Sequence, residues 1–139
     1  VPGSGQQAAP PKTDGSIIVV LATDAPLIPL QCQRLARRAA TGLAWAGGIG
    51  ANSSGDIFIA FSTANHVGQN DKISHVHMLA PDAMTSLFRA AAEATEEAIL
   101  NAMCMAETMV GRDGRTVHAL PLDLLQEVMD KYRPHKPSD

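Results

Sequence analysis

A continuous apolar run at residues 17–21 (IIVVL) most strongly constrains how this chain can fold. Its residues are mostly β-branched and do not alternate with polar ones, a pattern typical of a strand covered on both faces. The dipeptide Gly15-Ser16 stands directly before the run. We therefore expect the Ser16 hydroxyl to lie at the entrance of a buried β-sheet.

The Gly15-Ser16 junction has two interpretations. Because glycine tolerates strained backbone angles, the Gly15 carbonyl can be held against the Ser16 hydroxyl, a geometry that permits an N-to-O acyl shift. Hydrolysis of the resulting ester would leave Ser16 as a new N-terminus, with a nucleophilic hydroxyl and its own α-amine as a nearby base. A Gly-Ser pair before a strand is also a common turn, so the dipeptide alone leaves both interpretations open.

Length and charge exclude several classes of protein. The chain has 139 residues, enough for one domain with a sizeable core. Its net charge of −3 argues against a nucleic-acid partner, which would call for a basic patch. No apolar run approaches the roughly 18 residues that a membrane span needs. We expect a soluble protein of the cytoplasm or the periplasm, without a membrane partner.

Neither the cysteines nor the histidines indicate a metal site. Cys32 and Cys104 fall in helical patterns without metal-ligand spacing, so buried reduced thiols are expected, with a disulfide as the alternative. His75 and His77 would share a face of a short alternating segment, residues 73–78, which predicts a strand. Because a third ligand is not nearby, we expect a solvated or hydrogen-bonded histidine pair and no metal.

The remaining pattern predicts alternating helices and strands. Residues 1–14 are rich in Pro, Gly, Gln and Ala and are expected to form a linker. Helices are predicted at residues 29–46 and 81–110, and the later part of the second is apolar on nearly all sides, as expected inside a layer or under a subunit interface. A last amphipathic helix is expected to start at Pro121 with Leu124, Leu125, Val128 and Met129 inward. A second buried strand is expected at residues 57–62.

The loop before this second strand carries polar groups. Gly47 and Gly48 are expected to end the preceding helix, and the glycine-rich loop that follows, residues 49–56, contains Ser53, Ser54 and Asp56. A phosphate-binding role is rejected, because the loop lacks Gly-Lys-Ser/Thr and precedes a strand instead of a helix. Turn chemistry is the simplest role for these side chains.

Six segments together indicate a protein family far more specifically than any one of them does alone. They are GSIIVVLATDAP (15–26), RLARR (34–38), SGDIF (54–58), AFSTAN (60–65), EAILN (97–101) and ETMVGRDG (107–114). As a set they resemble the C-terminal portion of the L-aminopeptidase/D-esterase family, which includes the β-peptidyl aminopeptidases. The resemblance covers nearly all of the chain from Gly15 to about Pro121.

The resemblance implies an α+β fold, an αββα four-layer sandwich similar to N-terminal-nucleophile hydrolases but with different connectivity. It also implies that a precursor cuts itself between Gly15 and Ser16. Residues 1–15 would then be the tail of an α chain, and residues 16–139 a β chain that shares one αβ domain with it. We expect this α chain as a partner, and a homo-oligomer of αβ units.

The resemblance further assigns roles to three side chains. Ser16 would be the catalytic nucleophile, assisted by Ser54 and by Asp56, a position that is Glu in some relatives. The implied activity is hydrolysis of N-terminal amino-acid amides, esters or short peptides without a cofactor. Alternatives are an acyltransferase similar to ornithine acetyltransferase, which Ser rather than Thr at position 16 disfavours, and a self-processing protein that assembles without catalysis.

Overall fold

The computed structural model describes residues 15–132, so the predicted linker at residues 1–14 lies outside the described residues. Strands β1 (Ile18–Thr23) and β2 (Ile57–Ser62) form a two-stranded parallel sheet. Because the strands are parallel and in register, the segments that precede them meet at the same end of the sheet. Ser16 and Asp56 lie in these two segments.

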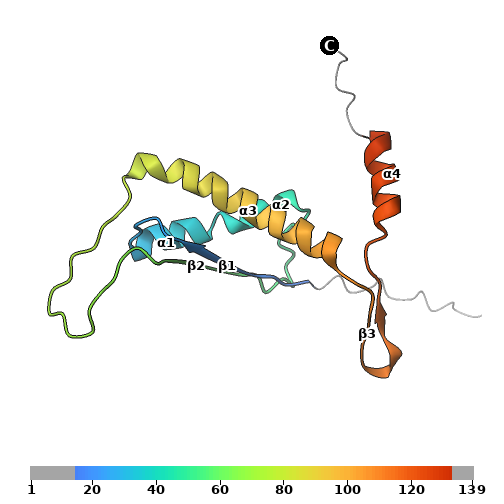
Figure 1. Ribbon diagram of the computed structural model, residues 1–139, viewed down its shortest axis with the longest axis horizontal. Helices are drawn as coiled ribbons and strands as arrows, with labels where there is room; N and C mark the ends of the chain where they lie inside the picture. Colours follow the sequence, from blue (N-terminus) through green and yellow to red (C-terminus); the bar gives the residue numbers. More distant parts are fainter. Residues whose placement is uncertain (1–14, 133–139) are drawn as a thin grey trace, which may run out of the picture.

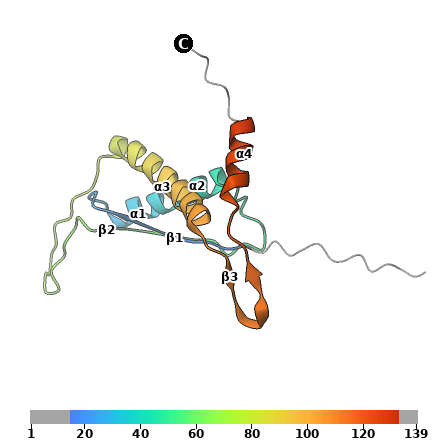
Figure 2. The ribbon, with the colours of Figure 1, turned by 45° about the vertical axis from the view of Figure 1, so that its right-hand side comes forward.

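Three helices lie on one face of this sheet (Figures 1 and 2). Helix α1 packs on both strands, and α2 packs mainly on α3. A short hairpin and α4 extend away from this body on the side where α3 ends (Figure 1). In chain order, the elements other than β1 and β2 are α1 (Pro29–Ala36), α2 (Ala39–Trp45), the 3-10 helix η1 (Pro81–Ala83), α3 (Met84–Met105), β3 (Met109–Val110), the 3-10 turn η2 (Arg112–Gly114), β4 (Thr116–Val117) and α4 (Leu122–Tyr132).

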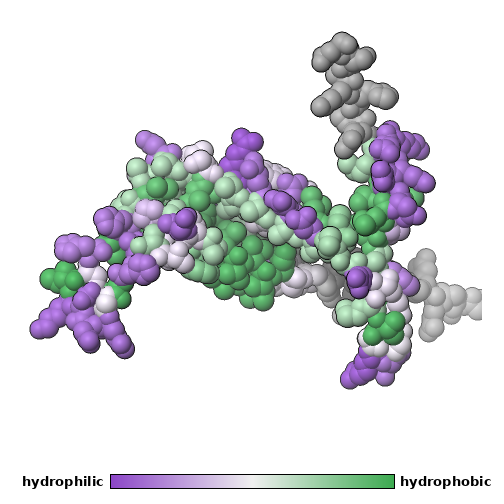
Figure 3. Space-filling model, in the orientation of Figure 1, coloured by the Kyte–Doolittle hydropathy of each residue, from purple (hydrophilic) through white to green (hydrophobic). Residues whose placement is uncertain are grey.

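The two faces of the sheet differ in cover. On the helix side, Leu21 and Ala60 pack against a core of Leu27, Leu35, Met84 and Ala91. On the other side, the apolar residues of both strands have 46–68% of their surface exposed: Ile18, Val20, Ile57, Ile59 and Phe61. Figure 3 shows apolar surface over the strands. Residues 17–21 were predicted to be covered on both faces. Within residues 15–132 they are covered on the helix side only.

The predicted helix at residues 29–46 is broken into two. It begins at Pro29 as expected, and Leu35 and Ala39 are buried as its inner stripe. At Arg38 the backbone N–H bonds three residues back, to the Leu35 carbonyl, and this tighter turn separates α1 from α2. The guanidinium of Arg38 lies 4.3 Å from the Phe88 ring centroid, so this side chain packs on α3.

Three other element predictions were wrong in part. The long helix ends at Met105, and the segment expected to continue it pairs as the hairpin β3–β4. This hairpin turns through Asp113 and Gly114, both with positive φ, and its cross-strand pairing outweighs the local helical pattern. Residues 73–78 form no strand. Helix α4 forms as expected, but none of its residues is buried within the described part of the chain.

Helices α2 and α3 cross closely at Gly42. An ideal Cβ at this position would overlap the backbone carbonyl oxygen of Ala92 and lie 2.7 Å from the Thr95 Cβ. Because backbone atoms cannot move aside as a flexible side chain can, we expect Gly42→Ala to lower the free energy of unfolding by about 3 kcal/mol, the upper end for an overpacked contact. Chemical denaturation of the full-length protein measures this.

Gly111→Ala is the matched control for this substitution. A Cβ at Gly111 would lie 3.6 Å from its nearest neighbour, the Arg115 carbonyl oxygen, which is an ordinary contact. Equal stability of the two variants would show that the helices can separate at Gly42 without cost.

Candidate active site

Ser16 lies on the surface two residues before the start of β1, and its hydroxyl accepts a hydrogen bond from a residue far away in the chain. The Gly55 backbone N–H donates a hydrogen bond to Ser16 Oγ at 3.0 Å, between residues 39 positions apart. The Ser16 nitrogen is in the peptide bond to Gly15 in this continuous chain. One backbone amide N–H is thus directed at the hydroxyl oxygen of the residue that follows Gly15.

Asp56 fixes the backbone on the other side of Ser16. Its Oδ1 accepts a hydrogen bond from the Ile17 N–H at 3.1 Å. The next backbone bond, from the Ile57 N–H to the Ile17 carbonyl at 2.9 Å, begins the pairing of the two strands. The carboxylate thus ties the residue that follows Ser16 to the start of β2, so the position of Ser16 depends on correct strand register.

A cavity of about 300 Å³ lies beside Ser16. It brings together all four residues that the sequence predicted for the site, namely Gly15, Ser16, Ser54 and Asp56. Ser54 is placed by a turn in which its N–H donates to the Ala51 carbonyl at 2.8 Å. The remaining lining residues are Ile17, Leu43, Gly48, Ile49, Gly50 and Ala51. Ser53 is exposed and does not line the cavity.

Sequence reasoning missed two contributions to this cavity. The first is Gly55, where a Cβ would stand 3.3 Å from Ser16 Oγ, tighter than most real contacts. The second is the glycine-rich stretch after α2, in which Gly47 and Gly50 have positive φ and turn the chain back toward β2. The run of glycines in this loop was visible in the sequence, but its place beside Ser16 depends on the pairing of β1 with β2.

Comparison with known families identifies the chain. The sequence model of peptidase family S58 matches residues 2–117, most of the chain. The chain belongs to this family. Its membership confirms the resemblance to the L-aminopeptidase/D-esterase group that the motifs indicated.

The S58 chain is similar to several longer proteins. It is 50% identical over 124 residues to the β-peptidyl aminopeptidase BapA of Sphingosinicella microcystinivorans, covering 86% of this chain and 31% of the relative. The PH0078 protein of Pyrococcus horikoshii OT3 is 46% identical, with a TM-score of 0.82 over 86% of this chain and 34% of that chain. The L-aminopeptidase D-Ala-esterase/amidase of Ochrobactrum anthropi is 42% identical, with a TM-score of 0.79 over 91% of this chain and 36% of that chain.

The structure of the Ochrobactrum enzyme is described as a prototype for the serine aminopeptidases and a variant of the Ntn (N-terminal nucleophile) hydrolase fold. The S58 chain therefore shares its mixed α and β fold with an aminopeptidase of that kind. It spans between 31% and 36% of the length of these three relatives.

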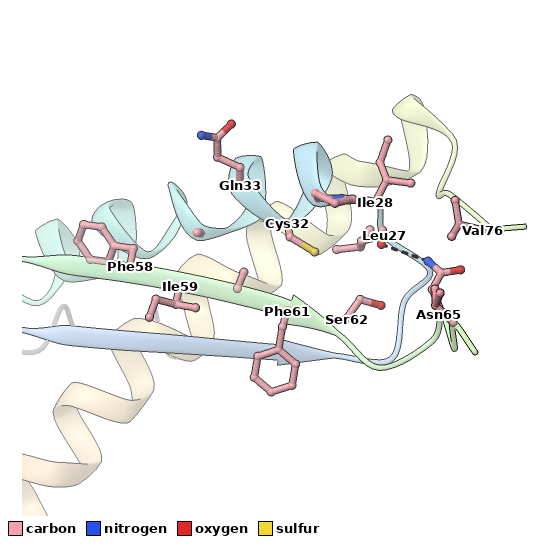
Figure 4. A pocket seen from close by; sticks show the side chains of 14 residues that line it. Leu27, Ile28, Cys32, Gln33, Phe58, Ile59, Phe61, Ser62, Asn65 and Val76 are labelled. Carbon is pink, nitrogen blue, oxygen red and sulfur yellow. Dashed lines mark hydrogen bonds between the residues drawn. The ribbon is translucent and has the colours of Figure 1, made fainter. Parts of the chain in front are cut away.

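A larger cavity in the S58 chain lies away from Ser16. It has a volume of about 630 Å³ and runs between α1 and β2 toward the ends of the strands that are remote from Ser16. Figure 4 shows Cys32 on its helix side and Phe61 projecting from the opposite face of β2. Because its lining includes successive residues of β2, from Phe58 to Ser62, the cavity surrounds the strand edge that β1 does not pair.

Other predicted features of the S58 chain lie apart from the site. His75 and His77 are exposed in an irregular loop, which Asn65 holds by accepting from the His77 N–H at 2.8 Å and donating to the His77 carbonyl at 2.9 Å. Cys32 and Cys104 are free, half-buried thiols in helices. Within residues 15–132, His, Cys, Asp and Glu side chains form no group of three or more that could hold a metal. None of the described helices is long and apolar enough to cross a membrane.

Proposed function

We propose that this chain is the nucleophile-bearing part of a self-processing aminopeptidase that hydrolyses N-terminal amino-acid amides, esters or short peptides. The observation that carries the proposal is the placement of Ser16 Oγ, bonded to the Gly55 N–H, in one cavity with Ser54 and Asp56. Membership of a peptidase family supports the hydrolytic chemistry. The names of the relatives support an aminopeptidase.

Self-cleavage would proceed at the Gly15–Ser16 bond. Ser16 Oγ attacks the Gly15 carbonyl carbon, and the hydroxyl proton passes to the Ser16 nitrogen as the C–N bond breaks. This leaves an ester to Oγ and a free α-amine. Water then hydrolyses the ester, which gives a Gly15 carboxylate and returns the Ser16 hydroxyl. The glycine before Ser16 suits this step, because it tolerates the strained backbone that the attack requires.

Turnover would repeat the same chemistry on a substrate. Ser16 Oγ attacks the carbonyl of the N-terminal residue, and the leaving amine or alcohol takes up a proton as the acyl-enzyme forms. In this proposal the freed Ser16 α-amine acts as the base, and Ser54, which lines the same cavity, relays the proton. Water then hydrolyses the acyl-enzyme. Asp56 acts through position, because its carboxylate holds the Ile17 N–H next to the nucleophile.

If Ser54 relays a proton, Ser54→Ala should lower kcat by about 10²-fold, the scale of general acid–base groups. The fold should survive, because the backbone bond from the Ser54 N–H to the Ala51 carbonyl does not involve the side chain. Steady-state hydrolysis of an aminoacyl p-nitroanilide measures the loss, with cleaved full-length protein in every assay.

Ser53→Ala is the matched control, since Ser53 is in the same loop but outside the cavity. Its turnover should stay close to that of the unchanged protein. If Ser54→Ala also keeps its turnover, Ser54 does not relay a proton and serves only to stabilise the turn.

A substrate screen separates this proposal from its two alternatives. Release of p-nitroaniline from aminoacyl p-nitroanilides is expected of an aminopeptidase. Transfer of acetyl from acetyl-ornithine to an amine acceptor would instead indicate an acyltransferase, in which the acyl-enzyme reacts with an amine in place of water. Self-cleavage without either activity would indicate a protein that only assembles.

We also propose that an upstream α chain from the same precursor completes the domain as an αββα sandwich. The exposed face of the sheet supports this, because Val20, Ile59 and Phe61 have 46–57% of their surface exposed on it, and apolar side chains gathered on one exposed face are typical of an interaction surface. The α chain would also cover the 630 Å³ cavity at the unpaired edge of β2. Assembly of αβ units into a homo-oligomer would cover the projecting hairpin and α4, whose apolar residues, Met109 and Val117 among them, are exposed.

A further inference from the structure

We infer that the backbone N–H of Gly55 is a catalytic group, which stabilises negative charge on Ser16 Oγ whenever that oxygen gives up a proton or an acyl group. This inference rests on the proposed function, in which Ser16 Oγ is the nucleophile. The Gly55 N–H donates to Ser16 Oγ at 3.0 Å. It thus contacts the reacting atom, although Gly55 was not among the site residues that the motifs predicted.

The residues on both sides of Gly55 hold its N–H in place. Ser54 is fixed by the turn in which its N–H donates to the Ala51 carbonyl at 2.8 Å. Asp56 is fixed to the Ile17 N–H through Oδ1 at 3.1 Å. A donor held in this way needs no rearrangement when charge develops on its acceptor, and this makes preorganised N–H groups effective in catalysis.

The close approach of Ser16 explains why a glycine stands at position 55. Gly55 is not one of the glycines with positive φ in the described chain, so its backbone angles do not require this residue. An ideal Cβ here would lie 3.3 Å from Ser16 Oγ and 4.0 Å from Ser16 Cβ. Apart from its chain neighbours, it would meet no other described atom within 4 Å. A side chain at position 55 would therefore press on Ser16 alone.

The hydrogen bond would act at two points of the proposed reaction. In the attack, Oγ loses its proton while it bonds to the carbonyl carbon, and the donor stabilises the charge that develops on Oγ. In hydrolysis of the ester, water adds to the carbonyl carbon, the C–Oγ bond breaks with its electron pair on Oγ, and the proton lost by water restores the hydroxyl. A hydrogen bond that is stronger in these transition states than in the hydroxyl or the ester accelerates both steps.

Replacing Gly55 by glycolic acid in the full-length precursor tests this role, because the resulting backbone ester removes the N–H and adds no side chain. Self-cleavage, followed by intact mass from the start of cell-free synthesis, should slow by about 10²-fold, the lower end for loss of one donor directed at developing charge. In the cleaved protein, kcat/KM for an aminoacyl p-nitroanilide should fall by a similar factor. Thermal unfolding should change little, because the bond is exposed and water competes for it.

The same ester at Gly111 is the matched control. It removes an N–H that donates to the Arg115 carbonyl at 2.7 Å in the hairpin, outside the cavity beside Ser16, so both rates should stay unchanged. Gly55→Ala is a second variant, which keeps the N–H but places a Cβ against Ser16 Oγ. Both rates should fall by about tenfold in this variant, because a small displacement of a nucleophile is costly.

A further readout does not depend on aminopeptidase activity. The rate at which phenylmethanesulfonyl fluoride modifies Ser16, followed by intact mass, should fall in the Gly55 ester variant, because the same oxygen attacks the reagent. Unchanged cleavage, hydrolysis and labelling in the folded ester variant would show that the N–H has no catalytic role, while the proposed function stands. An equal loss in the Gly111 ester would also overturn the inference, because the backbone ester itself would then be the cause. If the unchanged protein hydrolyses no aminoacyl substrate, the proposed function fails, and the labelling rates still decide the role of the Gly55 N–H.

Discussion

Replacing Ser16 by Ala is expected to leave a single uncut polypeptide without measurable peptidase activity. The substitution removes the oxygen that attacks the Gly15 carbonyl in the proposed acyl shift, and the same oxygen is the proposed nucleophile in turnover. Loss of a serine nucleophile costs about 10⁶-fold in kcat in a serine peptidase, so activity should fall below detection. The hydrogen bond lost with the hydroxyl is an exposed one from the Gly55 N–H, so the fold should remain.

Intact mass and a denaturing gel measure the cleavage, and p-nitroanilide hydrolysis measures the activity. Ser53→Ala, a serine in a nearby loop outside the cavity, should be cleaved and active. A Ser16→Ala protein that still splits between Gly15 and residue 16 would rule out Ser16 as the self-cleaving group.

Residues 16–139 expressed alone are expected to aggregate or to remain poorly folded, whereas co-expression with the upstream part of the precursor should give a soluble particle heavier than one αβ pair. A two-stranded sheet is marginal without further strands or cover. Here the uncovered face carries Ile18, Val20 and Ile59, all about half exposed or more, and α4 has no buried residue within the described chain.

Light scattering of the two preparations tests this expectation, with circular dichroism and thermal unfolding to assess the fold. Substituting Ile59 by Lys in the isolated chain is a useful comparison. If the exposed face drives aggregation, the charge should increase solubility of the isolated chain and impair assembly with the upstream part. A monomeric, cooperatively unfolding chain of residues 16–139 would contradict the idea that the sheet needs an upstream partner.

Local sequence patterns predicted most of the elements that position the site. The strands at residues 18–23 and 57–62 follow from their apolar β-branched runs, and α1 begins at Pro29 because proline suits the first helical turn. The errors occurred where pairing or packing with another segment decides the structure of a residue pattern. The helical pattern past Met105 gives way to a hairpin because its two strands pair with each other. The apolar stripe of α4 did not predict whether the helix would be buried, because such a stripe does not indicate which surface it packs against.

The sequence by itself was enough to indicate the family and to single out Gly15-Ser16, Ser54 and Asp56 as candidate site residues. Short motifs can be read this way because they consist of residue types at fixed spacing. Only the tertiary structure decided that these groups share a cavity, since parallel pairing brings together segments 39 residues apart. It alone assigned the Gly55 N–H to the Ser16 hydroxyl and placed the glycine-rich loop beside it. Every residue except proline has a backbone N–H, so the type of residue at position 55 could not predict this hydrogen bond.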